Sequence, residues 1–190
     1  MLIAITGNFG VGKSTLLEFF KKNGCEVYDS DKIVSELYKE KRLILKLKRQ
    51  FGNKIITNGK INKKELGKIV FEDKEKLSSL NKIVHGIVKQ KIKAIKHKGK
   101  LVFVEVPLLF EAKMESLFDK TILVIAPKKA CLKRLLKKGI KKREFEKRVS
   151  FQINKEKAKK KADYIINNNS TTRNFLVKAI KVYEKIRRSL

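Results

Sequence analysis

Short apolar runs rich in β-branched residues alternate with longer amphipathic stretches along this chain. The apolar runs lie at about residues 2–5, 27–29, 101–106, 121–125 and 164–166, and each has the length of a buried strand. Between the runs, apolar residues recur at the 3.6-residue period of helices. This alternation predicts an α/β fold whose parallel sheet is covered by helices on both faces.

The longest amphipathic stretch, at about residues 41–97, reads almost wholly helical and separates the second and third predicted strands. Asn58-Gly59 marks a turn inside it, and Asn62 with Glu65 has the form of a helix capping box. We expect this stretch to be a helical substrate lobe inserted into a single domain of residues 1–190.

Composition narrows the possible partners. Lys and Arg number 48 against 19 Asp and Glu, a formal net charge of +29 that attracts nucleic acids and phosphorylated small molecules. The lysines are spread along the chain, so we expect no nucleic-acid partner.

No apolar stretch approaches the ~20 residues that span a bilayer, so we expect a cytoplasmic protein without a membrane partner. Cys25 and Cys131 are expected to be unpaired thiols, and the oligomeric state is left open.

Residues 7–14, Gly-Asn-Phe-Gly-Val-Gly-Lys-Ser, match the phosphate-loop pattern G-x-x-x-x-G-K-[ST] in full. Glycines let backbone N–H groups wrap a phosphate, and the helix that begins near Lys13 adds the positive end of its dipole. Lys13 should reach the β- and γ-phosphates of ATP, Ser14 should bind Mg²⁺ and Thr15 should contact the α-phosphate. The expected nucleotide-binding residues are Gly10, Val11, Gly12, Lys13, Ser14 and Thr15.

Two acidic residues lie at the end of the second predicted strand: Asp29 is its last residue, and Asp31 comes two residues later. Ligands of a doubly wound sheet bind outside the carboxyl ends of its strands, so these carboxylates should project toward the phosphates. A carboxylate there can take the proton of an attacking hydroxyl or help to hold the metal. The alternative for either residue is a helix N-cap, a role open to Ser30 or Asp31. We assign Asp31 as the base.

Four segments resemble the dephospho-CoA kinase family in sequence order. Residues 27–31 (VYDSD) are similar to its V-I-D-A-D segment, and residues 105–111 (EVPLLFE) contain its V-P-L-L-F-E. Residues 80–85 (LNKIVH) resemble L-N-x-I-x-H-P, and residues 162–169 (ADYIINNN) resemble A-D-x-V-I-x-N-N-G. Arg148 and Gln152 also fall into register with the family. The resemblance covers nearly the whole chain.

This resemblance implies a three-layer α/β/α P-loop kinase fold with a five-stranded parallel sheet, a CoA-binding lobe at residues 41–97 and a lid at residues 137–148. It implies transfer of the ATP γ-phosphoryl group to the ribose 3′-hydroxyl of dephospho-CoA. Lys13, Asp31 and Arg148 would be catalytic, with Asp31 as general base. Substrate would be bound by Asp29, His85, Pro107, Leu108 and Leu109, and Asn168 would lie near the adenine.

Each residue beyond the phosphate loop also has a simpler interpretation. His85 fits a hydrogen-bonded core histidine, the segment 107–109 fits a core plug, and Arg148 fits a solvated charge. Asn168 lies in a run suited to a turn. Two positions depart from the family pattern: Gly86 replaces a proline, and Lys138 replaces an arginine, whose planar bidentate contact lysine cannot make. Arg134, Arg143 or Arg148 could take that task.

Two other functions are consistent with the sequence. One is a kinase for another small acceptor, such as a nucleoside monophosphate or a sugar acid. The other is a basic P-loop module that binds RNA with ATP as ligand, although interleaved aromatics are missing from its basic segments.

Overall fold

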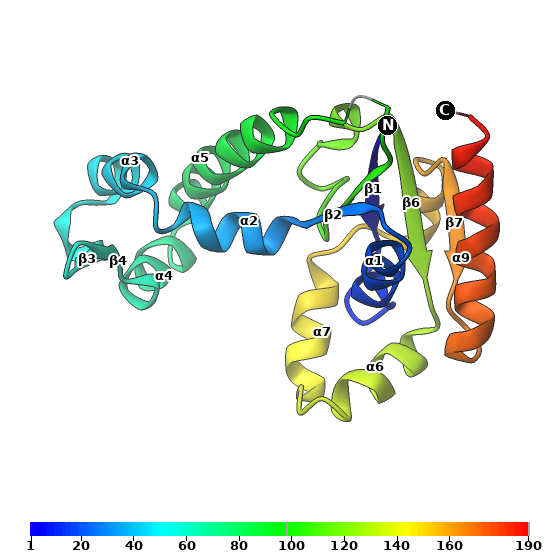
Figure 1. The fold of residues 1–190 in the computed structure, drawn as a ribbon. Helices are drawn as coiled ribbons and strands as arrows, with labels where there is room; N and C mark the ends of the chain where they lie inside the picture. The colour runs from blue at the N-terminus through cyan, green and yellow to red at the C-terminus, as the bar shows by residue number, and fades with distance from the viewer. Residues whose placement is uncertain (98, 190) are drawn as a thin grey trace. The chain divides into compact units, whose positions relative to one another are not determined.

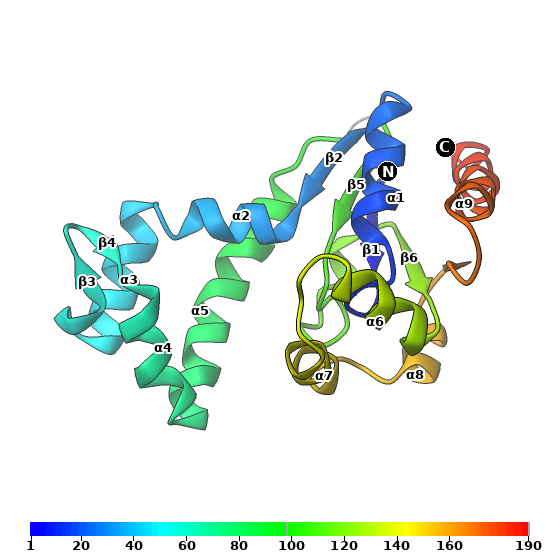
Figure 2. The ribbon, with the colours of Figure 1, turned by 90° about the horizontal axis from the view of Figure 1, so that it is seen from below.

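A five-stranded parallel sheet organises the computed structural model, which describes residues 1–97 and 99–189. Its strands, in the order β2-β5-β1-β6-β7, are β1 Leu2–Thr6, β2 Glu26–Asp29, β5 Val102–Glu105, β6 Lys120–Ile125 and β7 Tyr164–Asn167. The predicted α/β class and the five-stranded parallel sheet are confirmed. The first strand lies at the centre of the sheet, between β5 and β6 (Figure 2).

Helices fill the sequence between the strands, as Figures 1 and 2 show from two sides. They are α1 Lys13–Lys22, α2 Ser30–Leu37, α3 Lys41–Phe51, α4 Lys63–Phe71, α5 Lys74–Lys93, α6 Lys128–Leu136, α7 Lys142–Ser150, α8 Lys155–Lys159 and α9 Thr172–Arg187, with short 3₁₀ turns at η1 Asn53–Ile55 and η2 Glu115–Leu117. Within the described residues, no helix has the length and apolarity needed to cross a membrane.

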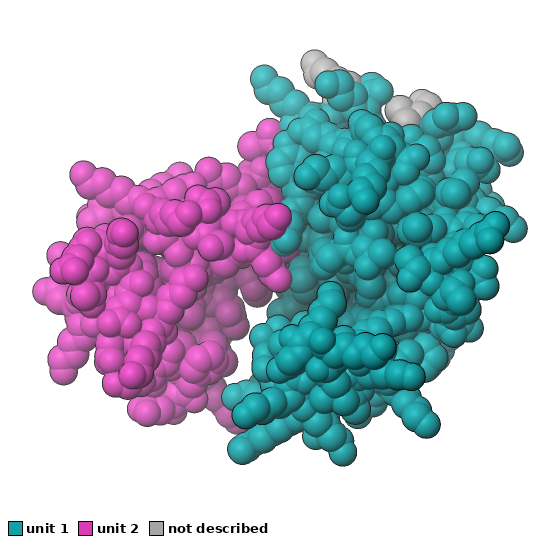
Figure 3. Space-filling model, turned by 60° about the horizontal axis from the view of Figure 1, so that its bottom comes forward, with its two compact units in different colours: residues 1–29, 96–190 teal, residues 30–95 magenta. Residues whose placement is uncertain are grey.

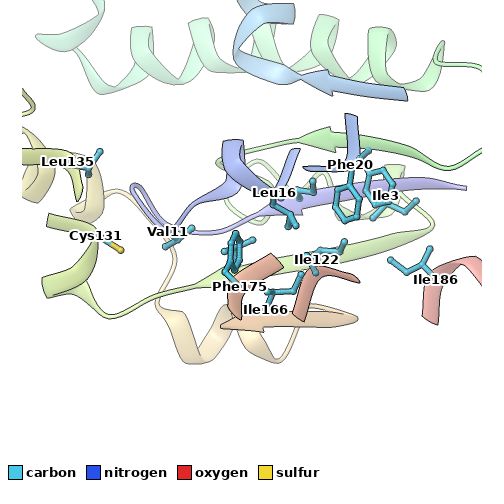
Figure 4. Packing of buried hydrophobic residues seen from close by; sticks show 14 of the residues in the cluster. Ile3, Val11, Leu16, Phe20, Ile122, Cys131, Leu135, Ile166, Phe175 and Ile186 are labelled. Atoms are coloured by element: carbon cyan, nitrogen blue, oxygen red, sulfur yellow. The ribbon is translucent and has the colours of Figure 1, made fainter. Parts of the chain in front are cut away.

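The core on one face of the sheet joins β1 to α1 and α9 (Figure 4). Ile3 of β1, Phe20 of α1 and Phe175 of α9 are all fully or almost fully buried in one cluster. Phe20 stacks on Phe103 of β5 with ring centroids 3.7 Å apart. Alternation sends neighbouring side chains to the other face, where Ala4 is also fully buried. Both faces are therefore covered, which explains why the strands read as continuous apolar runs.

The described chain divides into two compact units, coloured in Figure 3. Unit 1 comprises residues 1–29 and 96–190, and unit 2 comprises residues 30–95. Unit 1 contains the sheet, the phosphate loop and α6 to α9. Unit 2 contains α2 to α5 and therefore begins before the stretch 41–97 that we expect to be the substrate lobe.

The expectation that residues 41–97 are almost wholly helical is wrong at one place. Ile56–Thr57 (β3) and Lys60–Ile61 (β4) pair as an antiparallel hairpin. The expected turn at Asn58-Gly59 is confirmed: both residues have positive φ, at 50° and 72°, as a two-residue turn between twisted strands requires. The helical spacing of apolar residues in this stretch therefore led us to miss a short hairpin. The Asn-Gly pair was the clearest local evidence for it.

Helix starts follow the capping chemistry of the sequence in one case and depart from it in another. The Asn62 side chain accepts bonds from the amides of Lys64 and Glu65 at 3.1 and 3.2 Å, so Asn62 caps α4 as expected. The second bond of a capping box is not formed, because the Asn62 amide donates to the Ile55 carbonyl and the Glu65 carboxylate pairs with Lys68. Ser30 and Asp31 were both expected as possible caps, but α2 begins at Ser30 and holds Asp31 in its first turn. Both residues therefore lie in the first turn of this helix.

Candidate phosphoryl-transfer site

The phosphate loop joins the end of β1 to the start of α1, as its sequence predicts. Gly12 immediately precedes α1 at φ 106°, a conformation that glycine adopts without strain. A Cβ atom on Gly12 would lie 2.5 Å from Asn168 Nδ2, and one on Gly7 would lie 2.2 Å from the Val124 carbonyl oxygen. Both positions therefore require glycine for their backbone and for the close approach of neighbours.

The side chain of Lys13 is buried inside this loop. Its ammonium donates to the carbonyl oxygens of Gly7 at 2.9 Å and Asn8 at 3.2 Å. Lys13 is also the first residue of α1, and the dipole of that helix favours an anion at this end. The loop thus places a positive charge and the N-terminal amides of α1 together, which is the chemistry that binds a polyphosphate.

The carboxylate of Glu105 lies beside the phosphate loop, and the sequence did not identify it as a site residue. Glu105 ends β5 and is 8% exposed, and its Oε1 lies 3.5 Å from Ser14 Oγ. The available signal was its place at the end of a buried strand, at the sheet edge where ligands bind. Hydroxyl and carboxylate oxygens are ligands that Mg²⁺ prefers. Across residues 1–97 and 99–189, no three His, Cys, Asp or Glu residues come together as a metal site.

Strand register extends this acidic edge. Asp29, the last residue of β2, is paired with Glu105 of β5, and Glu105 is paired with Ile5 of β1. The structure therefore brings Asp29 to the carboxyl edge that also carries the phosphate loop. Asp31 follows in the first turn of α2, which belongs to unit 2.

Arg148 of α7 lies over the phosphate loop. The centre of its guanidinium group is 4.6 Å from the centroid of the Phe9 ring, and its Nη2 is 2.7 Å from Glu144 Oε1. Its side chain is 54% exposed, so the surrounding water screens the Glu144 pair. The structure brings this predicted residue to the loop. Lys138 and Arg143, the other basic candidates on this stretch, are exposed.

Asn168 connects the end of β7 to the phosphate loop. It is buried, and its Nδ2 donates to the Val11 carbonyl at 2.8 Å. Arg134 of α6 donates through Nη2 to the Asn168 side-chain oxygen at 3.0 Å and to its carbonyl at 3.1 Å. Both residues thus support the loop structurally. The expected position of Asn168 near adenine stays a prediction.

The segment after β5 supplies the predicted acceptor-side residues. Leu109 is fully buried and Pro107 is half-buried, whereas Leu108 is 41% exposed. The core-plug interpretation therefore describes Leu109, and Leu108 is the member of this segment whose side chain is available to a ligand.

His85 belongs to unit 2, on α5 between the buried Val84 and Ile87. It is half-buried. Burial lowers its pKa, and the nearby positive charge of Lys89 lowers it further. A neutral imidazole can accept or donate a hydrogen bond, so this environment suits either a core histidine or one that lines a polar ligand pocket.

Comparisons with known proteins agree over nearly the whole chain. The family model described as dephospho-CoA kinase matches residues 1–174. A dephospho-CoA kinase of Fusobacterium nucleatum is 38% identical, with 98% of each chain covered. The solved dephospho-CoA kinase of Campylobacter jejuni superimposes with a TM-score of 0.73 at 29% identity, covering 99% of this chain and 98% of that one. A shikimate kinase of Acinetobacter baumannii, at 18% identity and a TM-score of 0.60, covers 99% of this chain and 93% of its own and shares the fold.

Proposed function

The chain belongs to the dephospho-CoA kinase family, and we propose below which of its residues carry out the reaction. It transfers the γ-phosphoryl group of ATP to the ribose 3′-hydroxyl of dephospho-CoA, the last step of coenzyme A biosynthesis. The observation that carries the assignment of residues is the complete phosphate loop with the buried Lys13 ammonium inside it.

We assign nucleotide binding to the loop amides from Gly10 to Thr15 and to Lys13. Backbone N–H groups at the start of α1 would hold the phosphate oxygens, and the Lys13 ammonium would neutralise the β- and γ-phosphates. Donors held in this arrangement would stabilise the charge that develops on the transferring phosphoryl group. Asn168, which supports Val11 from beneath the loop, would lie beside the adenine.

Mg²⁺ is the divalent ion that this donor set fits. Ser14 Oγ and Glu105 Oε1 are two oxygen atoms at the loop, 3.5 Å apart, and Mg²⁺ usually takes one or two protein oxygens while keeping water and phosphate ligands. We therefore assign Ser14 and Glu105 to the ion, directly or through its water. When bound, the ion would neutralise charge on the transferring phosphate.

The hydroxyl of the acceptor requires a base, and we assign this role to Asp31. Asp31 follows Asp29, which register places beside Glu105 at the carboxyl edge of the sheet. Asp29 is assigned to substrate binding at the same edge. Arg148, held over Phe9, would stabilise charge on the phosphoryl group, and the lid of residues 137–148 would exclude water.

We assign the binding of dephospho-CoA to four residues and to the lobe of residues 41–97. Pro107, Leu108 and Leu109 of unit 1 would face the ribose or pantetheine, with the exposed Leu108 making the contact. His85 and the lobe of residues 41–97 in unit 2 would hold the rest of the molecule. A cytoplasmic location and the absence of a nucleic-acid partner stay predictions from composition.

The decisive experiment measures ADP release with and without dephospho-CoA. We expect a low ATPase rate that rises by at least about a hundredfold when dephospho-CoA is added, because bound acceptor replaces water at the γ-phosphorus. A panel of nucleoside monophosphates and sugar acids serves as the control. Stimulation by one of those and not by dephospho-CoA would contradict the proposal. Salt-sensitive RNA retention without any stimulation would favour the RNA-binding alternative.

A further inference from the structure

The stretch that follows α7, residues 151–153, lies between two segments assigned to different substrates. The backbone N–H of Phe9 in the phosphate loop donates to Gln152 Oε1 at 2.8 Å. The backbone N–H of Ile153 donates to Glu111 Oε1 at 2.7 Å. Glu111 ends the segment that carries the exposed Leu108. One short stretch is therefore bonded to the ATP loop on one side and to the acceptor-side segment on the other.

Phe9 is held from two directions by this region. Gln152 fixes its peptide group, and the Arg148 guanidinium lies 4.6 Å from its ring centroid. The Gln152 N–H in turn donates to the Val149 carbonyl at 3.1 Å, so the side chain extends from the C-terminal end of α7. The Phe9 peptide of the loop and the Arg148 side chain are therefore both in contact with this one region of the chain.

We propose that Gln152 and Glu111 are positioning residues that keep the phosphate loop and the acceptor-side segment in a fixed relation through residues 151–153. The proposal rests on the proposed function, which assigns ATP to the loop and dephospho-CoA to the segment 107–109. Without the Gln152 oxygen, the Phe9 peptide group can rotate, and the adjacent loop amides lose their orientation toward phosphate. Without the Glu111 oxygen, the stretch 151–153 is released from the acceptor side.

This arrangement predicts thermodynamic coupling between the two substrates. A ligand that orders the phosphate loop also orders residues 151–153, so the second ligand meets a segment that is already in place. Nucleotide should therefore bind more tightly when dephospho-CoA is present, and the reverse by the same factor. Removal of either side-chain oxygen should reduce that factor toward one.

Phe151 offers a reporter for the test. The chain contains no tryptophan, and Phe151 is 71% exposed, so a Phe151→Trp variant places one fluorophore in the stretch at little structural risk. After its ADP release is shown to match the unaltered chain, the reporter is titrated with ADP and Mg²⁺, with dephospho-CoA, and with each ligand in the presence of the other. These titrations measure binding and need no phosphoryl transfer.

In the reporter background, Gln152→Met should weaken ADP binding about three- to tenfold, the net effect of one hydrogen bond, and should abolish the coupling. Gln152→Glu keeps the acceptor oxygen and should restore the coupling factor, whereas its negative charge beside the phosphates should keep ADP binding weak in a way that added salt relieves. Glu111→Met should leave ADP binding alone nearly unchanged but lose the coupling and the dephospho-CoA signal, and Glu111→Gln should restore them.

Unchanged ADP affinity and coupling in Gln152→Met would overturn the proposal. An equal loss of all signals in both methionine variants, together with a lower unfolding midpoint, would also overturn it, because that pattern indicates a general structural role. Failure of the proposed function looks different: the unaltered chain then shows no ADP release stimulated by dephospho-CoA. In that case the ADP titrations of the reporter with and without Gln152→Met still decide whether Gln152 positions the loop.

Discussion

A hydroxyl that attacks the γ-phosphorus must lose a proton. We assign Asp31, in the first turn of α2, as the base that takes this proton. The residue is exposed on its helix, so its replacement by the isosteric asparagine should leave the fold of the unit intact. Its role is therefore one that a single substitution can isolate.

We predict that Asp31→Asn lowers kcat by about 10²- to 10⁴-fold, the usual contribution of a positioned base, while the Kd for ATP changes less than about twofold. Steady-state ADP release and nucleotide titration measure the two effects. Glu36→Gln on the same helix, where Glu36 pairs with the exposed Lys39, removes the same charge and should behave like the unaltered chain. A kcat retained in Asp31→Asn would remove Asp31 from the mechanism.

At the scale of secondary-structure elements, the edge strand β7 is fastened to β6 by Asp163. Thr121 donates to Asp163 Oδ2 through its amide and through its hydroxyl, both at 2.8 Å, and the same hydroxyl accepts from the Asp163 amide at 3.0 Å. Burial raises the pKa of Asp163, but the bonds from Thr121 and the charge of Lys120 outweigh burial and leave this pKa below its ordinary value. The strand so held leads directly to Asn168 under the phosphate loop.

Asp163→Ala should lower the free energy of unfolding by about 1–3 kcal/mol at pH 7, because two donors of Thr121 lose their partner. The folded pKa is depressed, so the carboxylate stabilises the fold above its unfolded pKa of about 3.9, and this stabilisation is lost as pH falls through the lower folded value. Urea unfolding at pH 7 and pH 3 should therefore show a smaller difference between variant and unaltered chain at pH 3. An equal difference at both pH values would contradict the assigned role of the carboxylate.

At the scale of the whole molecule, the net charge of +29 affects how fast substrates reach the protein more than how fast the phosphoryl group is transferred. ATP and dephospho-CoA are both anionic, and a strongly positive surface raises the rate at which such ligands reach it. This attraction acts over distances that salt screens, since the Debye length is about 10 Å at 0.1 M ionic strength.

We predict that kcat/KM for both substrates falls about three- to tenfold between 20 and 300 mM added salt, while kcat changes much less. Initial rates at low substrate concentration, with a neutral solute at matched osmolarity as control, measure this effect. A kcat/KM that does not depend on salt would show that the lysines do not assist binding.

The expectations that succeeded depend on local patterns. The strands appear as apolar runs because each is buried on both faces, and the phosphate loop is recognisable because its glycines and Lys13 follow one another directly. Asn62 as a cap and Asn58-Gly59 as a turn are also short-range effects, and both are confirmed. The short hairpin β3–β4 and the true start of α2 were missed because local period and capping preference are weak against tertiary packing.

The sequence by itself therefore determined the fold class, the phosphate loop and the family of this protein, because each is written in neighbouring residues or in segments of recognisable order. Only the tertiary structure decided the strand order, the approach of Glu105 to Ser14, and the bonds that join Gln152 to Phe9 and Asn168 to Val11. These contacts join residues far apart in the chain. These contacts become favourable only when the folded sheet has buried the groups and brought them to the right distance, so no local sequence pattern predicts them.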